Sequence, residues 1–157
     1  MTPDACPLCR DAGGTVLWHN GQLRVIAVDD DAHPGFTRVI WREHVAEMTQ
    51  LPPQARNDIM AAVWLVEQTQ RRILQADKIN LAQFGNMVPH LHWHVIPRWA
   101  DDSHYPEAIW AVPPARSPEQ AAAWTRHKAD IEALLPHYRA TLQATLQDSN
   151  IGVTPNA

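Results

Sequence analysis

Three histidines alternate with apolar residues in the segment 90–97, which reads His-Leu-His-Trp-His-Val-Ile-Pro. Successive side chains of a β-strand point to opposite faces, so a strand here sets His90, His92 and His94 in a row on one face. The residues between them form an apolar stripe on the other face. The stripe explains why the segment forms a strand, but the imidazoles require a chemical explanation.

Three interpretations of this histidine row follow from the residues alone. The row is a polar strand face, a set of ligands for a mononuclear metal ion, or the carrier of a nucleophile that attacks phosphorus. Imidazoles two residues apart along a strand are separated by about 6.5 Å, so three of them do not easily converge on one ion. A neutral imidazole is a good nucleophile at neutral pH, and a neighbouring imidazole can hydrogen-bond phosphoryl oxygens. The spacing favours the nucleophile.

A second chemical group near the N-terminus is the pair Cys6 and Cys9, whose Cys-x-x-Cys spacing supplies half of a tetrahedral zinc site. The alternatives are two unlinked thiols and a redox pair, which needs a strand-to-helix junction in a βαβ setting. These are the only two cysteines in the sequence. In a reducing compartment such a close pair favours a metal site or a redox pair over a structural disulfide.

The elements that position these groups are predicted from periodicity and turn signals. Short apolar runs at 16–19 and 23–28 flank an Asn-Gly turn, and further strands are expected at 36–41, at roughly 78–84 and in the histidine segment. A helix is expected from about Pro52 to about Gln75. A C-terminal helix begins at a capping box on Ser117 and is expected to break near Pro136.

Strands joined mostly by short turns predict an α+β fold: a five-stranded antiparallel meander with one long helix and a C-terminal helix. We expect a single domain over residues 1–147 and a flexible tail over residues 148–157. The length of 157 residues suffices for a core without disulfide staples.

Composition limits the classes of partner. The formal net charge is −4 and there is no block of Lys or Arg, which argues against a long nucleic acid as ligand. A small anion can still be bound by backbone amides and imidazoles. We expect no membrane span and no signal peptide, and hence a cytoplasmic protein.

The histidine segment resembles the His-φ-His-φ-His-φ-φ motif of the histidine triad (HIT) family, in which φ is an apolar residue. The resemblance covers about residues 6–110. It is closest to a bacterial branch in which Phe-Thr-Arg-Val-Ile-Trp, a long helix, Lys-Ile-Asn-Leu-Ala and Gly-Asn-Met-Val-Pro occur in this order. The resemblance implies a HIT-like fold, a homodimer and a nucleotide hydrolase or transferase that forms a nucleotidyl-histidine intermediate. The implied substrates are phosphoramidates, adenylylated amines or dinucleoside polyphosphates.

The resemblance also implies roles for individual residues. His92 corresponds to the nucleophile, and His94 to the residue that contacts the phosphate and assists the leaving group. Asn80 and Asn86 correspond to residues that hydrogen-bond phosphate or leaving-group atoms. An acidic residue that binds ribose hydroxyls corresponds to Asp29, with Asp30 as an equally good register.

Two departures from the family pattern concern turnover and substrate choice. Much of the family has a fourth histidine where this chain has Phe36, and we expect Phe36 at the edge of the pocket, where a substitution would alter turnover rather than stability. His33, in the preceding turn, is expected to be solvated. Asn86 stands where much of the family has Gln, so its amide has a shorter reach.

In many members of the family, an N-terminal cysteine pair binds structural zinc together with two histidines. By position the zinc ligands here are Cys6, Cys9, His44 and His90, and no catalytic cofactor is expected. Two alternatives stay open: a non-catalytic nucleotide-binding or zinc-stabilised interaction protein, and a mononuclear metal enzyme that uses the histidine row as ligands.

Overall fold

The computed structural model describes residues 1–152. Its centre is a five-stranded antiparallel sheet in the order β1-β2-β3-β5-β4. The strands are β1 (Thr15–His19), β2 (Leu23–Ala27), β3 (Thr37–Trp41), β4 (Lys78–Ala82) and β5 (His92–Arg98). The predicted α+β class with five antiparallel strands is confirmed. The first three strands form the expected meander, whereas β5 lies between β3 and β4 and leaves β4 at the edge.

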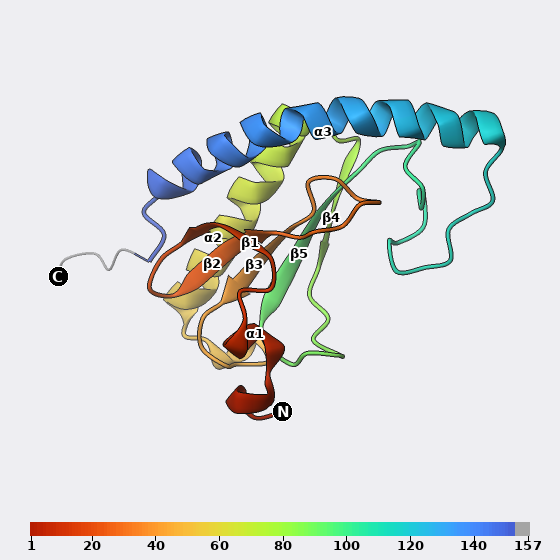
Figure 1. Cartoon of the computed structure of the whole chain (residues 1–157). Helices are drawn as coiled ribbons and strands as arrows, with labels where there is room; N and C mark the ends of the chain where they lie inside the picture. Colours follow the sequence, from red (N-terminus) through yellow and green to blue (C-terminus); the bar gives the residue numbers. More distant parts are fainter. Residues whose placement is uncertain (153–157) are drawn as a thin grey trace.

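The helices are of two kinds. Three are short: η1 (Pro3–Ala5) and α1 (Pro7–Arg10) precede β1, and η2 (Met48–Gln50) lies between β3 and the first long helix. The two long elements are α2 (Pro53–Thr69), extended by the π-helical η3 (Gln70–Leu74), and α3 (Pro118–Gln147). Figure 1 shows α3 along one end of the sheet and the N-terminal turns at the opposite end. Within residues 1–152 no helix combines the length and the apolar character needed to cross a membrane.

The sheet buries one face against α2 and α3. Alternate residues of the strands, such as Val25, Val39 and Val95, are fully buried in one cluster with Ile59 of α2 and Leu142 of α3. Burial of this stripe from water is what holds the helices on the sheet. The opposite face carries the histidines and a smaller apolar cluster.

The expected break at Pro136 is wrong, because α3 continues through this residue to Gln147. Proline cannot donate the hydrogen bond that the carbonyl of Glu132 would accept. Both residues are exposed, so water can hydrogen-bond to that carbonyl.

The predicted flexible tail, residues 148–157, is described only as far as residue 152. Within it, Ile151 is buried in the main cluster, and its carbonyl accepts a hydrogen bond from Asn20 (3.0 Å). Residues 153–157 lie outside the described part of the chain.

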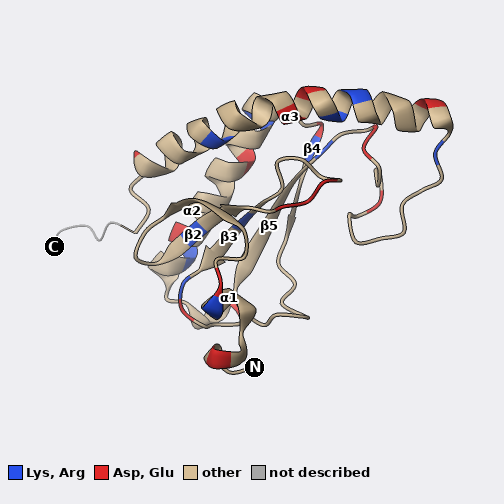
Figure 2. Ribbon diagram, viewed as in Figure 1, with Lys and Arg blue, Asp and Glu red and all other residues tan. Residues whose placement is uncertain are grey.

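Over residues 1–152 the basic residues form no continuous tract on the structure. Figure 2 shows Lys and Arg interspersed with Asp and Glu along α3 and the loops.

Candidate active site

The sheet register places two of the three histidines on the face opposite α2. On β3 and β5, Arg38 pairs with His94 and Ile40 pairs with His92, and on the edge strand Ala82 pairs with His94. Directly paired residues point to the same face. His92 and His94 therefore project side by side, with ring centroids 4.7 Å apart.

The third histidine leaves the row. The strand β5 begins at His92, so His90 precedes it, and the expectation of three imidazoles on one strand face is wrong for His90. The backbone just before the strand is held by neighbours instead: the amide of Leu91 donates to the carbonyl of Val45 (2.7 Å), and the amide of Trp41 donates to the carbonyl of Leu91 (3.0 Å). His90 is fully buried away from the other two imidazoles and beside the cysteines.

The surroundings of His92 allow only one of the two neutral tautomers of its imidazole. Its Nδ1 lies 2.6 Å from the carbonyl oxygen of His90, and a carbonyl only accepts, so Nδ1 carries the proton. The lone pair is then on Nε2. Burial lowers the pKa of His92, against the effect of the His90 carbonyl, so the ring is neutral at pH 7.

His94 has the opposite tautomer. The Nε of Arg38 donates to Nδ1 of His94 at 3.4 Å, and a guanidinium has donors only. The proton of a neutral His94 is therefore on Nε2. Burial, followed by the neighbouring His92 and Arg38, lowers the pKa of His94 to about 3. One imidazole thus offers a lone pair and its neighbour an N–H donor.

The two imidazoles open into a cavity of about 550 Å³, a volume suited to a small-molecule ligand. Its wall combines a few polar side chains with apolar and aromatic ones. The lining residues are Pro7, Leu8, Gly13, Arg38, Phe84, Gly85, Asn86, Met87, Val88, His92, His94 and Trp110. Phe84 and Trp110 meet edge to face with centroids 4.8 Å apart, and both rings are about half exposed.

The residues expected to bind nucleotide are divided by the structure. Asn86 lines the cavity, whereas Asn80 and Asp29 do not. The side-chain oxygen of Asn80 accepts a hydrogen bond from Arg98 (2.9 Å). Asp29 is exposed, and within residues 1–152 no hydrogen bond to its carboxylate is found.

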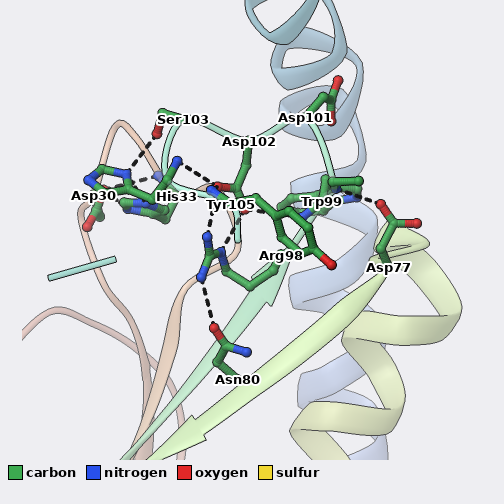
Figure 3. A network of polar contacts seen from close by, with 12 residues as sticks. Asp30, His33, Asp77, Asn80, Arg98, Trp99, Asp101, Asp102, Ser103 and Tyr105 are labelled. Atoms are coloured by element: carbon green, nitrogen blue, oxygen red, sulfur yellow. Dashed lines mark hydrogen bonds and ion pairs between the residues drawn. The ribbon is translucent and has the colours of Figure 1, made fainter. Parts of the chain in front are cut away.

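Figure 3 shows the network that holds Asn80. Arg98 makes a bidentate ion pair with Asp102, with N···O distances of 2.7 and 2.9 Å, and both side chains are about 2% exposed. The same network region contains His33, which is buried and not solvated as expected. Its Nδ1 lies 3.1 Å from Asp30 and its Nε2 lies 3.1 Å from Nδ1 of His104, because the turn folds back onto the loop after β5.

Phe36 is buried (3% exposed), not at the pocket edge as expected. Its ring lies 5.7 Å from the ring of His94, and the guanidinium of Arg38 lies over it at 5.4 Å. Where the resemblance to histidine triad proteins implies a fourth histidine, this chain thus packs an apolar ring against His94 and Arg38. A substitution here is expected to change stability as well as turnover.

The predicted zinc ligands converge. The candidate ligand atoms of Cys6, Cys9, His44 and His90 all lie within 4.8 Å of one another. The S···N distances are 3.5 Å (Cys6–His90), 3.4 Å (Cys9–His90) and 3.3 Å (Cys9–His44), and the two Nδ1 atoms are 3.4 Å apart. In tetrahedral coordination, zinc bond lengths of about 2.3 Å to sulfur and about 2.05 Å to nitrogen place a sulfur and a nitrogen ligand about 3.6 Å apart and two nitrogen ligands about 3.3 Å apart. The four side chains fit this geometry.

The hydrogen bonds of His90 and His44 on the side of each ring away from the cysteines also favour a metal site. Nε2 of His90 lies 2.7 Å from the carbonyl of Trp41, and Nε2 of His44 lies 3.1 Å from the carbonyl of Met1. Each carbonyl accepts the ring proton and leaves a lone pair on Nδ1, which is the usual outer contact of a metal-bound histidine. Two lone pairs and two thiols facing one another form a site for a cation.

Sequence reasoning missed Arg38 and Phe84. The signal for Arg38 was present, since a charged residue alternates with Thr37 and Val39 in a buried strand. Assigning it to the pocket requires the register between β3 and β5, which pairs residues 56 positions apart.

The site and fold together can be compared with known proteins. The sequence model of the HIT domain matches residues 11–101, more than half of the chain. The protein therefore belongs to the HIT family, the histidine triad proteins, whose members are nucleotide-binding hydrolases and transferases. The cysteine pair and α3 lie outside the matched segment.

Solved structures of bacterial and archaeal histidine triad proteins share the fold. A histidine triad protein from Marinobacter aquaeolei VT8 is 26% identical, with 81% of this chain and 92% of that chain covered and a TM-score of 0.59. A Zn-bound histidine triad family protein from Mycobacterium smegmatis is 22% identical (92% and 99% covered, TM-score 0.56). A hypothetical histidine triad nucleotide-binding protein from Sulfolobus tokodaii strain7 is 18% identical (90% and 93% covered, TM-score 0.58). No curated protein sequence matches the chain.

Proposed function

We propose that the protein hydrolyses or transfers nucleotides by attack of His92 on the α-phosphorus of a small nucleotide substrate. The observation that carries this proposal is the pair of opposite tautomers in one cavity. His92 presents a lone pair on Nε2, and His94 presents an N–H donor beside it.

In the first step the Nε2 lone pair of His92 forms a bond to the α-phosphorus, and the bond from phosphorus to the leaving group breaks with its electron pair on the leaving group. The His92 ring becomes a nucleotidyl-imidazolium, and the hydrogen bond from its Nδ1–H to the His90 carbonyl stabilises the positive charge. His94 and Asn86 donate hydrogen bonds to phosphoryl oxygens.

In the second step water attacks the same phosphorus and loses a proton to solvent. The bond between phosphorus and Nε2 breaks with its electron pair returning to His92. The products are a nucleoside monophosphate and the original enzyme. Attack by another acceptor instead of water gives transfer.

Further residues are assigned to substrate binding by position. We assign the ribose hydroxyls to Asp29, because its exposed carboxylate is free of protein hydrogen bonds within the described chain. The carboxylate of Asp30, by contrast, already accepts hydrogen bonds from His33 and Ala32. The hydrogen bond from Arg98 to Asn80 favours a structural role for Asn80, in which it supports the end of β5.

The edge strand β4, with Leu81 41% exposed, is a suitable surface for the homodimer expected of the family.

We also propose that Cys6, Cys9, His44 and His90 hold structural zinc. A bound zinc ion supplies fold stability and no reaction step. Its consequence for the site is mechanical, because His90 provides the carbonyl that orients His92. A mononuclear metal centre built from the histidine row is disfavoured, because His90 faces the cysteines and not the cavity.

A panel of nucleotide substrates tests the proposal, assayed with and without added divalent metal. We expect metal-independent release of a nucleoside monophosphate, and a nucleotide adduct on the peptide containing His92 by mass spectrometry after rapid quenching. The control is His19→Ala, which removes an exposed histidine from β1, outside the cavity. Tight binding without turnover would indicate a nucleotide sensor, and activity that is lost on stripping and restored by iron would indicate a metal enzyme.

A further inference from the structure

The candidate active site contains one formal charge. Among the described residues that line the cavity, Arg38 is the only Lys, Arg, Asp or Glu, in a protein whose net charge is −4. The walls are otherwise apolar, aromatic or neutral. The guanidinium of Arg38 therefore makes the formal charge of the cavity wall positive, which favours an anionic ligand there.

The carboxylate of Asp30 favours the charge of this guanidinium only from a distance, without forming an ion pair with it. Within residues 1–152 Arg38 forms no ion pair, and its one hydrogen bond to protein is the 3.4 Å contact from Nε to His94. The ring of Phe36 lies beneath its Cζ at 5.4 Å, which stabilises a cation from one side. The two terminal NH₂ groups are thus available to a ligand in the cavity, and a half-buried cation without such a ligand is costly.

The register between β3 and β5 places the charge of Arg38 beside His94. Arg38 is paired with His94, whereas the partner of His92 on β3 is Ile40. The nucleophile attacks from His92, so the leaving group departs on the side away from it, where His94 stands. Arg38 therefore lies closer to the leaving group than to the nucleophile.

We propose that Arg38 binds a phosphate of the leaving group, so that the enzyme prefers nucleoside and dinucleoside polyphosphates over phosphoramidates and adenylylated amines. Guanidinium groups match phosphate oxygens with two parallel N–H donors. The inference rests on the proposed function in taking His92 as the nucleophile, and it adds the class of substrate.

The chemistry of the leaving group agrees with this assignment. When the bond from the α-phosphorus to the bridging oxygen of an anhydride breaks, the electron pair stays on that oxygen, and the leaving phosphate departs as an anion without needing a proton. Arg38 neutralises the charge as it develops. An amine cannot depart as an anion and needs a proton. His94, whose pKa is lowered to about 3, is neutral at pH 7 and is not an imidazolium acid that could supply one.

Steady-state kinetics on two substrates test the proposal. Diadenosine tetraphosphate has a phosphate leaving group, and adenosine 5′-phosphoramidate has none. In Arg38→Gln we expect kcat/KM for diadenosine tetraphosphate to fall by about 100-fold or more, the usual cost of one lost transition-state donor, and kcat/KM for the phosphoramidate to fall by less than about 5-fold. Arg42→Gln is the matched control, because Arg42 follows the same strand but is exposed and outside the cavity.

A binding measurement keeps this inference distinct from the proposed function. By titration calorimetry, Arg38→Gln should weaken ATP by about 10-fold or more and AMP by less than about 3-fold, whether or not the wild-type protein turns over. Absence of turnover by the wild type would refute the proposed function alone. An equal loss for both substrates, together with an unchanged ratio of ATP to AMP affinity, would overturn the role of Arg38 and assign it to the α-phosphate or to the fold.

Discussion

Removal of zinc from the Cys6, Cys9, His44 and His90 cluster should destabilise the whole domain. The ligand atoms come from three places in the chain: the N-terminal turns, the loop after β3 and the residues before β5. Zinc bound there ties the N-terminus to the centre of the sheet. The perturbation has two forms, a chelator added to the purified protein and the substitution His44→Ala.

The expected magnitude follows from linkage. A ligand that binds only the folded state stabilises it by about 2.7 kcal/mol at 100 times its dissociation constant and by about 4.1 kcal/mol at 1,000 times. For a domain of this size, 1 kcal/mol shifts the melting temperature by about 2–4 °C. Chelation should therefore lower the melting temperature by about 5–15 °C.

The assay combines elemental analysis with thermal unfolding. We expect about one zinc per chain in the purified protein, as for a closed four-ligand site, and lower zinc content and melting temperature in His44→Ala and Cys6→Ser. His137→Ala is the control, because His137 is an exposed residue of α3. A metal-free protein whose melting temperature is the same with chelator and in both variants would refute the zinc site. It would also remove the reason for the convergence of the four ligand atoms.

Three further predictions concern the cavity and the buried ion pair. His92→Ala should lower kcat by about 1,000-fold or more while nucleotide affinity stays within a few-fold. His94→Ala should lower kcat less, because it leaves the nucleophile in place. Wild-type turnover in His92→Ala would refute the assignment of His92 as the nucleophile. Phe36→His should lower the free energy of unfolding by about 1–3 kcal/mol, since it buries a polar ring, and should also shift the pH–rate profile. Denaturant unfolding measures the first effect and steady-state kinetics the second. An unchanged profile would make Phe36 a packing residue only. Asp102→Asn should cost about 3 kcal/mol because it leaves Arg98 buried without its partner. Asp101→Asn should cost less than about 1 kcal/mol, because Asp101 is only partly buried and its ion pair with His127 is open to solvent. Equal losses in urea unfolding would contradict this.

The pH dependence of Asp102 has a definite sign. Burial opposes ionisation of Asp102, but the hydrogen bonds from Arg98 and from the amides of His104 and Trp99 hold its pKa below the usual value. A carboxyl with a depressed pKa contributes stability that is complete above its unfolded pKa of about 3.9 and is lost as the pH falls through the folded value. The difference in stability between wild type and Asp102→Asn should therefore shrink in acid.

Local patterns were sufficient for the five strands and the two long helices, but not for the short helices η1, α1 and η2. Alternation of apolar residues predicted the strands, and the capping box at Ser117 marked the first residues of α3, because both depend on interactions between residues close in the chain. The same locality explains the error at Pro136. A proline removes one hydrogen bond wherever it stands, but whether the helix ends there depends on the packing of residues on both sides of it, which the local sequence does not contain.

The chemical types at the candidate site were also evident from the sequence: two imidazoles at alternate positions, a cysteine pair at chelating spacing, and Asn86 after Gly85. Only the tertiary structure decided how they combine. His90 leaves the row because β5 begins two residues later, Cys6 and His90 meet across 84 positions, and Arg38 faces His94 through the register of β3 with β5. Spacing along one element determines which side chains share a face. Which faces then meet depends on register and loop closure, and these are set by the burial of apolar surface over the whole chain.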